Sequence, residues 1–148
     1  MKFLKEKIDN IQKKLKKYNR KKLFIIAGEK SFKKSGAHKL IRFIKFAQIK
    51  YYIKKSDIPE IKELKKIIKS IKKFKPEYIF SVGGGAVIDL GKSANFLWNI
   101  KDLESSIKKS NYKKQINYCD LVAIPTTAGS GAEVTGNSVI YIKKKKYS

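Results

Sequence analysis

The stretch SVGGGAVIDLGKSAN, residues 81–95, joins a short apolar run to a helical pattern through three consecutive glycines, Gly83, Gly84 and Gly85. Glycine has no Cβ, so the backbone can turn sharply there and a ligand can approach the main chain closely. The helix that follows would direct its first N–H groups and its positive dipole end at that ligand. This combination favours a phosphate or a pyrophosphate. The alternative is a tight strand-to-helix turn that binds no ligand.

Two common nucleotide motifs do not fit this stretch. A Rossmann fingerprint G-x-G-x-x-G that starts at Gly83 would need a glycine where the chain has Ile88. A P-loop that ends in the GKS of residues 91–93 would need a glycine where the chain has Ala86. The glycine turn therefore needs another explanation.

A second segment rich in small and hydroxyl-bearing residues, PTTAGSGAEVTG at 125–136, follows an apolar run later in the chain. The segment predicts a loop that begins a helix near Ala132. Hydroxyl groups in such a loop either cap backbone groups or hydrogen-bond a ligand.

Hydrophobic periodicity divides the chain into alternating helices and strands that must position these two segments. Helices are predicted at 3–18, at 35–47 with Ser35 as N-cap, at 61–71, and from the glycine turn to Leu97. Strands are predicted at 22–27, 48–53, 78–82, 120–124 and 138–142. The polar segment 99–118 is expected to hold one short helix.

Strands that alternate with helices imply a parallel sheet with helices on both faces. The expected fold class is therefore α/β, a Rossmann-like doubly wound parallel sheet in a single domain, residues 1–148. Ligands of such sheets lie beyond the carboxyl ends of the strands. At that edge, three predicted strands lead into Gly28, into the glycine turn 83–85 and into the segment 126–131.

The charge of the chain restricts the classes of partner. Lys and Arg total 36 against 12 Asp and Glu, a formal net charge of +24, yet only Arg20 and Arg42 are arginines. Arginine is the residue that binds phosphates and guanines bidentately, and the lysines here are spread along the whole chain. We therefore expect a solvated lysine surface with weak nonspecific affinity for polyanions, and no specific nucleic-acid partner.

The remaining composition argues against a membrane or secreted protein. No apolar run approaches the roughly 18 residues of a membrane span, and the N-terminus is charged where a signal peptide needs an apolar stretch. Cys119 is the only cysteine, so we expect neither an intrachain disulfide nor a cysteine-based metal cluster. A cytoplasmic location with no membrane partner is the simplest expectation.

GGGAVIDLGK (83–92) followed by IPTTAGSGAEVT (124–135) resembles the iron-containing, or group III, alcohol dehydrogenase family, whose members carry GGGSxxDxxK and PTTxGTGSEVT motifs. The resemblance covers roughly residues 20–148 and implies that this region is the dinucleotide-binding domain. The related dehydroquinate synthases share the glycine triplet, but their second motif continues differently. The ending VIYIKKKKYS and the segment KSFKKSGA at 30–37 also resemble the subgroup that reduces phosphonoacetaldehyde.

The resemblance implies roles for individual residues of the two motifs. Gly84 and Gly85 would contact the cofactor pyrophosphate. Asp89 would lie beside the nicotinamide ribose or order the glycine turn. Thr126 and Thr127 would hydrogen-bond the cofactor near its adenine and ribose.

Three further residues belong to the same expected site. Ser130 would lie close to the threonines, and Lys146 matches a basic position that contacts the cofactor ribose, unless it is a solvated lysine in a run of four. Glu29 follows the first strand, where the family often has an aspartate for the adenosine ribose hydroxyls. A carboxylate there favours NAD, because it repels a 2′-phosphate. If Gly28 occupies that position instead, NADP fits as well, so both cofactors stay open.

The chain also departs from the family pattern. Ala86 replaces the serine of GGGS, and Ile58 stands where an Asn-Pro pair is typical. In that family one aspartate and three histidines of a separate all-helical domain hold the catalytic metal, whereas this chain has one histidine, His38. The resemblance therefore implies no catalytic residue and no metal ligand here. Iron or zinc would belong to a full-length member, and this chain is expected to be a piece that is inactive alone.

The leading hypothesis is the NAD(P)-binding part of a metal-dependent alcohol dehydrogenase or aldehyde reductase. By resemblance, the full-length enzyme would be a homodimer that transfers hydride between nicotinamide and a small alcohol or aldehyde. One alternative is a remnant that binds a nucleotide and catalyses nothing. The other is a polybasic protein that binds nucleic acid.

Overall fold

A computed structural model of the chain describes residues 10–112, 115–127 and 131–148, and its centre is a four-stranded parallel sheet. The strands are β1 (Lys22–Gly28), β2 (Gln48–Lys54), β3 (Tyr78–Gly83) and β4 (Asp120–Pro125). Their order across the sheet is β2-β1-β3-β4. The α/β class and the parallel sheet predicted from the sequence are therefore confirmed.

Strand β1 shows why a continuous apolar run folds as a central strand. Successive side chains of a strand point to opposite faces, and helices cover both faces of this sheet. Phe24 and Ile26 belong to the hydrophobic core on one face, while Leu23, Ile25 and Ala27 belong to the core on the other. All five side chains are fully buried.

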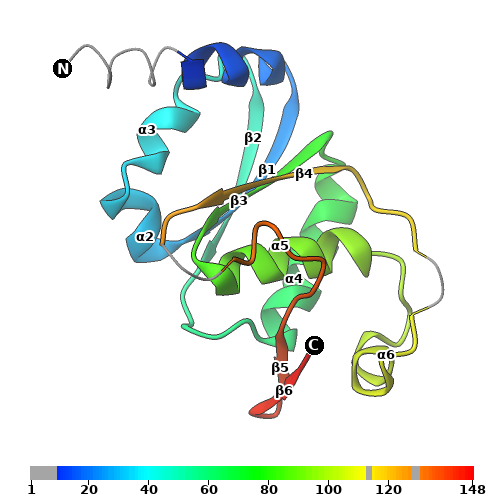
Figure 1. Cartoon of the computed structure of the whole chain (residues 1–148). Coiled ribbons are helices and arrows are strands. Elements are labelled where there is room, and N and C mark those ends of the chain that lie inside the picture. Colours follow the sequence, from blue (N-terminus) through cyan, green and yellow to red (C-terminus); the bar gives the residue numbers. More distant parts are fainter. Residues whose placement is uncertain (1–9, 113–114, 128–130) are drawn as a thin grey trace.

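The helices divide between the two faces of the sheet, as Figure 1 shows. One face packs against η1 (Lys16–Tyr18), α2 (Glu29–Lys34) and α3 (Ala37–Ile41). The other packs against α4 (Ile61–Phe74), α5 (Gly85–Phe96) and α6 (Leu103–Lys109). From β1 the chain crosses to β2 on one side, then returns past β1 to β3 on the other. The direction of winding therefore reverses between β1 and β3, which is where such sheets bind ligands.

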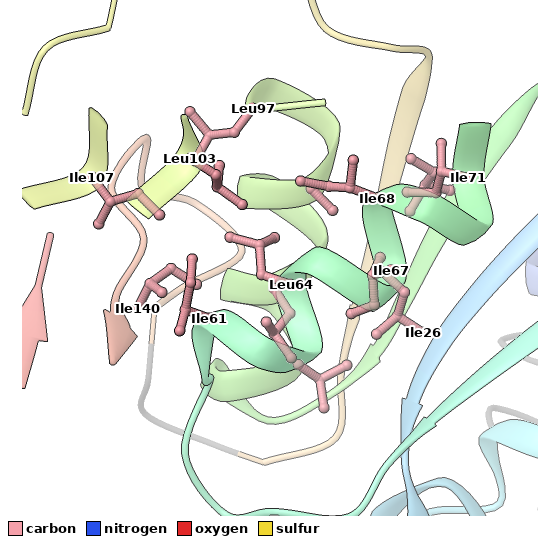
Figure 2. Close-up of a cluster of buried hydrophobic side chains, with 14 of the residues drawn as sticks. Ile26, Ile61, Leu64, Ile67, Ile68, Ile71, Leu97, Leu103, Ile107 and Ile140 are labelled. Atoms are coloured by element: carbon pink, nitrogen blue, oxygen red, sulfur yellow. The ribbon is translucent and has the colours of Figure 1, made fainter. Parts of the chain in front are cut away.

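Helix α4 owes its position to a strict amphipathic pattern. Its five buried side chains are all aliphatic, and most of its other positions are lysines. Figure 2 shows this stripe facing Leu97, Leu103 and Ile107 of the neighbouring segments, with Ile140 beside Ile61. The buried residues of the stripe are Ile61, Leu64, Ile67, Ile68 and Ile71.

Helix α5 approaches the sheet closely because its middle carries a glycine. A Cβ built on Gly91 would lie 1.7 Å from Ser81 Oγ of β3, so no larger residue fits without a shift. Ser81 is fully buried, and its hydroxyl has no hydrogen-bond partner among the described residues. The contact thus sets the distance between α5 and the sheet.

The C-terminal residues form a small antiparallel hairpin, β5 (Ile140–Ile142) and β6 (Lys145–Tyr147), separate from the main sheet. It docks on the segment before α4, because Tyr141 N donates to Pro59 O at 2.8 Å. Lys143 and Lys144 form the two-residue turn with φ of 47° and 67°. Positive φ at both positions marks a type I′ turn, which usually contains Asn or Gly. Two lysines gave no such signal, so the sequence did not predict β6.

Most predicted elements are confirmed, including the short helix α6 within 99–118. The helix predicted for 35–47 is wrong in its bounds, because α3 covers only Ala37–Ile41. Its N-cap is Gly36, at φ 75°, whereas the predicted N-cap Ser35 is the C-cap of α2. Beyond α3, i→i+3 bonds such as that from Ile44 N to Ile41 O keep Ile44 in the core without an α-helix. The helix expected near Ala132 is only a turn at 132–134.

Of the helix predicted at 3–18, residues 10–15 are α-helical and continue into η1, while residues 1–9 lie outside the described part of the chain. Tyr18 anchors this segment, with its ring edge-on to Tyr78 at 4.9 Å and to Phe80 at 4.8 Å. Among the described residues, no helix combines the length and apolar character that a membrane crossing requires.

Candidate functional site

A cleft of about 380 Å³ lies at the carboxyl edge of the sheet, where the winding reverses. The ends of β1, β2 and β3 meet there with the first turns of α2 and α5. The lining residues are Gly28, Glu29, Lys30, Ser31, Lys54, Lys55, Ser56, Asp57, Gly84, Gly85, Ala86 and Val87. The sequence-predicted residues Glu29, Gly84 and Gly85 therefore share one cleft, although 55 positions separate Glu29 from Gly84.

The glycine turn needs glycine because neighbouring side chains lie close to its backbone, and not because its backbone conformation is unusual. Gly84, the N-cap of α5, has φ −80° and ψ −175°, which any residue can adopt. A Cβ on Gly84 would lie 3.0 Å from Thr127 Oγ1, and one on Gly83 would lie 2.7 Å from Val87 Cγ2. The turn is thus too tight for side chains.

The first turn of α5 leaves its backbone donors available. A helix cannot satisfy its first N–H groups internally, and no side chain within the described residues caps this end. Gly85 and Ala86 begin the helix inside the cleft, with no acidic residue in the first turn. The N–H groups and the positive helix end together suit an anionic oxygen-rich ligand.

Thr126 and Thr127 join the glycine turn from the end of β4. Thr126 N donates to Gly83 O at 3.0 Å, which extends the pairing of β3 with β4 by one step. The Oγ1 atom of Thr126 is buried and has no hydrogen-bond partner in the described parts of the chain. Thr127 is exposed, and its hydroxyl lies against Gly84.

A buried ion pair that the sequence did not reveal fixes the opposite wall of the cleft. Lys54 is only 3% exposed, and its Nζ lies 3.5 Å from Glu63 Oε2 of α4. Lys54 Nζ also donates to the carbonyl O of Ser56 and, at 3.1 Å, to Ser56 Oγ. Ser56 Oγ donates in turn to Glu63 Oε2 at 2.7 Å. From sequence alone, a lysine at the end of a strand is expected to be exposed to solvent. The ion pair between Lys54 and Glu63 is therefore identified only from the fold.

Lys92 contacts the second motif, at Ala132 and Thr135, and Asp89 contacts the segment that follows it. Asp89 Oδ2 accepts a hydrogen bond from Val139 N at 3.1 Å, and Asp89 Oδ1 lies 3.4 Å from Lys92 Nζ. Both side chains are largely buried, at 14% and 16% exposure. Asp89 does not line the cleft.

Two other predicted residues lie elsewhere. Lys146 is exposed on β6, opposite Tyr141 in the hairpin, and does not line the cleft. Ser130 lies outside the described residues, so its predicted place near the threonines stays a prediction.

A larger cavity of about 730 Å³ lies along the side of α5, between α6, the start of β4 and the C-terminal hairpin. It includes Lys92, Asn95 and Cys119 but none of the three glycines of the turn. Burial raises the pKa of the Cys119 thiol to about 11, so this cysteine is a poor nucleophile. The smaller cleft is the better candidate for a nucleotide, because the backbone donors lie there.

The described residues offer no group of three or more His, Cys, Asp or Glu side chains that could hold a metal ion. His38 lies on α3 and is half-buried, with Nδ1 3.2 Å from the carbonyl O of Phe32 on α2.

The comparison with known proteins agrees with this geometry. The family model "Iron-containing alcohol dehydrogenase" matches residues 1–148. An alcohol dehydrogenase of Thermococcus barophilus is 30% identical over 96 residues, which are 61% of this chain and 25% of that protein. An NADPH-dependent butanol dehydrogenase of Clostridium saccharobutylicum is 28% identical over 131 residues, 85% of this chain and 34% of that protein.

A solved structure is similar as well. The sulfoacetaldehyde reductase of Bifidobacterium kashiwanohense, in complex with NAD+, has a TM-score of 0.71 and 28% identity. The match covers 86% of this chain and 35% of that protein. The chain thus spans a quarter to about a third of the relatives' length. Because the family model matches the whole chain, the protein belongs to the iron-containing alcohol dehydrogenase family.

Proposed function

We propose that the chain binds a nicotinamide dinucleotide, NAD or NADP, in the cleft at the carboxyl edge of the sheet. In this proposal it is the cofactor-binding part of a metal-dependent alcohol dehydrogenase or aldehyde reductase. The observation that carries the proposal is the uncapped first turn of α5, which opens into the cleft beside Gly84 and Gly85.

The residues of the cleft fit a dinucleotide pyrophosphate. The N–H groups of Gly85 and Ala86 can donate to phosphate oxygens, and Gly84 and Gly85 line the cleft without side chains. Thr126 and Thr127 do not line the cleft but adjoin the glycine turn, so their contacts with the cofactor remain predictions. The cleft volume, about 380 Å³, falls in the range of small-molecule sites.

Glu29 favours NAD over NADP in this proposal. Its carboxylate begins α2 and lines the cleft beside Gly28, where it can accept hydrogen bonds from two ribose hydroxyls. A 2′-phosphate at the same place would meet like charge. Lys30 and Lys55 also line the cleft and reduce that repulsion.

A bound nicotinamide ring would supply the hydride of the family's reaction. The described residues do not fit the metal that the family's name implies, since they form no cluster of suitable side chains. The contribution that we propose for this chain is therefore to bind and orient the cofactor. The small alcohol or aldehyde substrate, homodimer formation and a cytoplasmic location remain predictions for the protein as a whole.

Titration of the chain with NADH and NADPH, followed by the fluorescence of the reduced nicotinamide, tests the proposal. We expect saturable binding of NADH below millimolar concentration, with NADPH weaker. Double-stranded DNA at physiological salt serves as the comparison ligand. Binding of DNA without saturable binding of either dinucleotide would favour the polybasic alternative. We expect the chain alone, without a full-length family member or a metal ion in the assay, to show no turnover of small aldehydes.

A further inference from the structure

Helix α5 fastens the second motif to the first through three side chains on one of its faces. Asp89, Lys92 and Ser93 have the i, i+3, i+4 spacing that brings side chains together on a helix. Lys92 Nζ donates to the carbonyl oxygens of Ala132 at 3.0 Å and Thr135 at 3.3 Å, and also to that of Asn137.

The other two residues hold the far end of the same loop. Asp89 Oδ2 accepts from Val139 N at 3.1 Å, and the hydroxyls of Ser93 and Ser138 lie 2.8 Å apart. The loop of residues 131–139, which we call the anchored loop, is therefore bound at both ends by a single helix.

Most of the anchored loop is exposed to solvent, although Ala132 is buried. Residues 133–137 are all exposed, and Val134 is 83% exposed. Within the loop, Val134 N donates to Gly131 O at 3.1 Å and Thr135 Oγ1 donates to Asn137 O at 3.5 Å. The ammonium of Lys92, with three carbonyl oxygens and a carboxylate around it, is the strongest organising contact.

We propose that Asp89, Lys92 and Ser93 are positioning residues that hold the anchored loop on α5 and thereby keep Thr126 and Thr127 against the glycine turn. The two threonines precede the loop by only a few residues, so an increase in the motion of the loop would also displace the threonines. Both oxygens of Asp89 are engaged within the protein, by Val139 N and Lys92. In this proposal the DxxK half of the first motif contacts the anchored loop, while the glycines of the motif contact the cofactor. This inference rests on the proposed function for its effect on binding.

Amide hydrogen exchange of the cofactor-free chain tests the anchoring directly. In Lys92→Met the side-chain stem remains, but the ammonium is lost and the three carbonyls lose their donor. We expect the two hydrogen-bonded amides of the loop, Val134 and Val139, to exchange roughly tenfold faster, while amides of β1 and β3 are unchanged. Lys69→Met, at an exposed position of α4, is the matched control and should leave the loop unaffected.

Dinucleotide titration of the same variants tests the link to the cleft. Lys92→Met should weaken NADH binding about tenfold without a comparable loss of thermal stability. Asp89→Asn, which keeps an acceptor for Val139 N–H, should weaken it less. The double variant should resemble Lys92→Met, because the two side chains act as one unit.

Each result decides a different part of the inference. Unchanged exchange of 131–139 in Lys92→Met would overturn the anchoring, and a loss of affinity in Asp89→Asn alone would then assign Asp89 to the cofactor. Faster exchange with unchanged affinity would overturn the link to the cleft. If the unmodified chain binds no dinucleotide, the proposed function fails, whereas faster exchange would still support the anchoring. If Lys92→Met does not fold, exchange in the nearly isosteric Asp89→Asn decides.

Discussion

Helix α5 contains two regions that use the same motif in opposite ways. Its first turn, at Gly84 and Gly85, presents bare backbone and has no capping side chain among the described residues. Its second and third turns, at Asp89, Lys92 and Ser93, present side chains whose polar groups are bound to the anchored loop. The first region can bind a ligand because its donors are unused, and the second can hold the protein together because its groups are satisfied.

This difference teaches how ten residues can serve two purposes. A ligand must come close to the backbone N–H groups at a helix end to accept their hydrogen bonds, and side chains there would obstruct it. An exposed loop needs charged side chains that reach across to its carbonyls. Placing both on one helix couples cofactor contact to loop position. Substitutions in the first region should therefore alter affinity alone, and those in the middle of the helix should alter packing or loop order.

The largest expected effect is the loss of affinity in Gly84→Val. Its Cβ would lie about 3 Å from Thr127 Oγ1, so the turn that carries the Gly85 and Ala86 N–H groups must shift away from Thr127. We expect NADH affinity to fall roughly a hundredfold, with a change in melting temperature of only a few degrees. Fluorescence titration and circular dichroism measure the two quantities. Gly136→Ala, where nothing lies within 4 Å of the added Cβ, is the control. Equal losses of affinity in both variants would break the comparison.

The next largest effect is on stability, in Gly91→Ala. The new Cβ would overlap Ser81 Oγ, so α5 must move away from β3. Overpacking of this kind costs about 2 kcal/mol, or roughly 4–8 °C in melting temperature for a chain of this size. Ser81→Ala removes a hydroxyl without a described partner and should recover part of that loss in the double variant. Additive losses in the double variant would contradict the close contact.

These two glycines show what the sequence could and could not predict. The glycine turn stood out, because three consecutive glycines between an apolar run and a helix pattern have few explanations. Gly91 did not, since a single glycine within a helix pattern has many. Glu29 was predicted from the resemblance to the family and Gly84 from the glycine turn, and they share the cleft because both follow strands of one parallel sheet. The contact of Lys54 was not predicted, because among so many lysines nothing marks the one that the fold buries. Lys92 belongs to the first motif, but its loop partners, distant in sequence, were not predicted.

A smaller effect concerns the choice of cofactor. Glu29→Gln removes the charge that we expect to repel a 2′-phosphate but keeps a similar shape. The ratio of NADPH to NADH dissociation constants should fall by about tenfold, mostly through tighter NADPH binding. Titration of both dinucleotides into the variant measures this ratio. An unchanged ratio would remove Glu29 from the proposed ribose contact while leaving the role of the glycine turn intact.

The last prediction concerns chemical reactivity and its pH dependence at the far end of α5, away from the cleft. The Asn95 side chain accepts from Cys119 N at 3.1 Å and donates to Cys119 O at 2.9 Å, so this end of the helix also binds protein. Burial raises the pKa of the Cys119 thiol from 9.0 to about 11. At pH 8 the thiolate fraction should be roughly a hundredfold below that of an ordinary cysteine. Labelling by an aromatic disulfide should therefore be slow at pH 8 and accelerate towards pH 11. Rapid labelling at pH 8 would show that this region opens.

The most direct measurement of the central claim is NADH titration followed residue by residue in the ¹⁵N NMR spectrum of the chain. We predict saturable shifts of the Gly84, Gly85 and Ala86 amides, with smaller shifts at Thr126 and Thr127. The Val139 amide, which Asp89 holds, should change little. Saturable shifts confined to the larger cavity beside α5, or no saturable shift at the glycine turn, would contradict the assignment of the cofactor to this cleft.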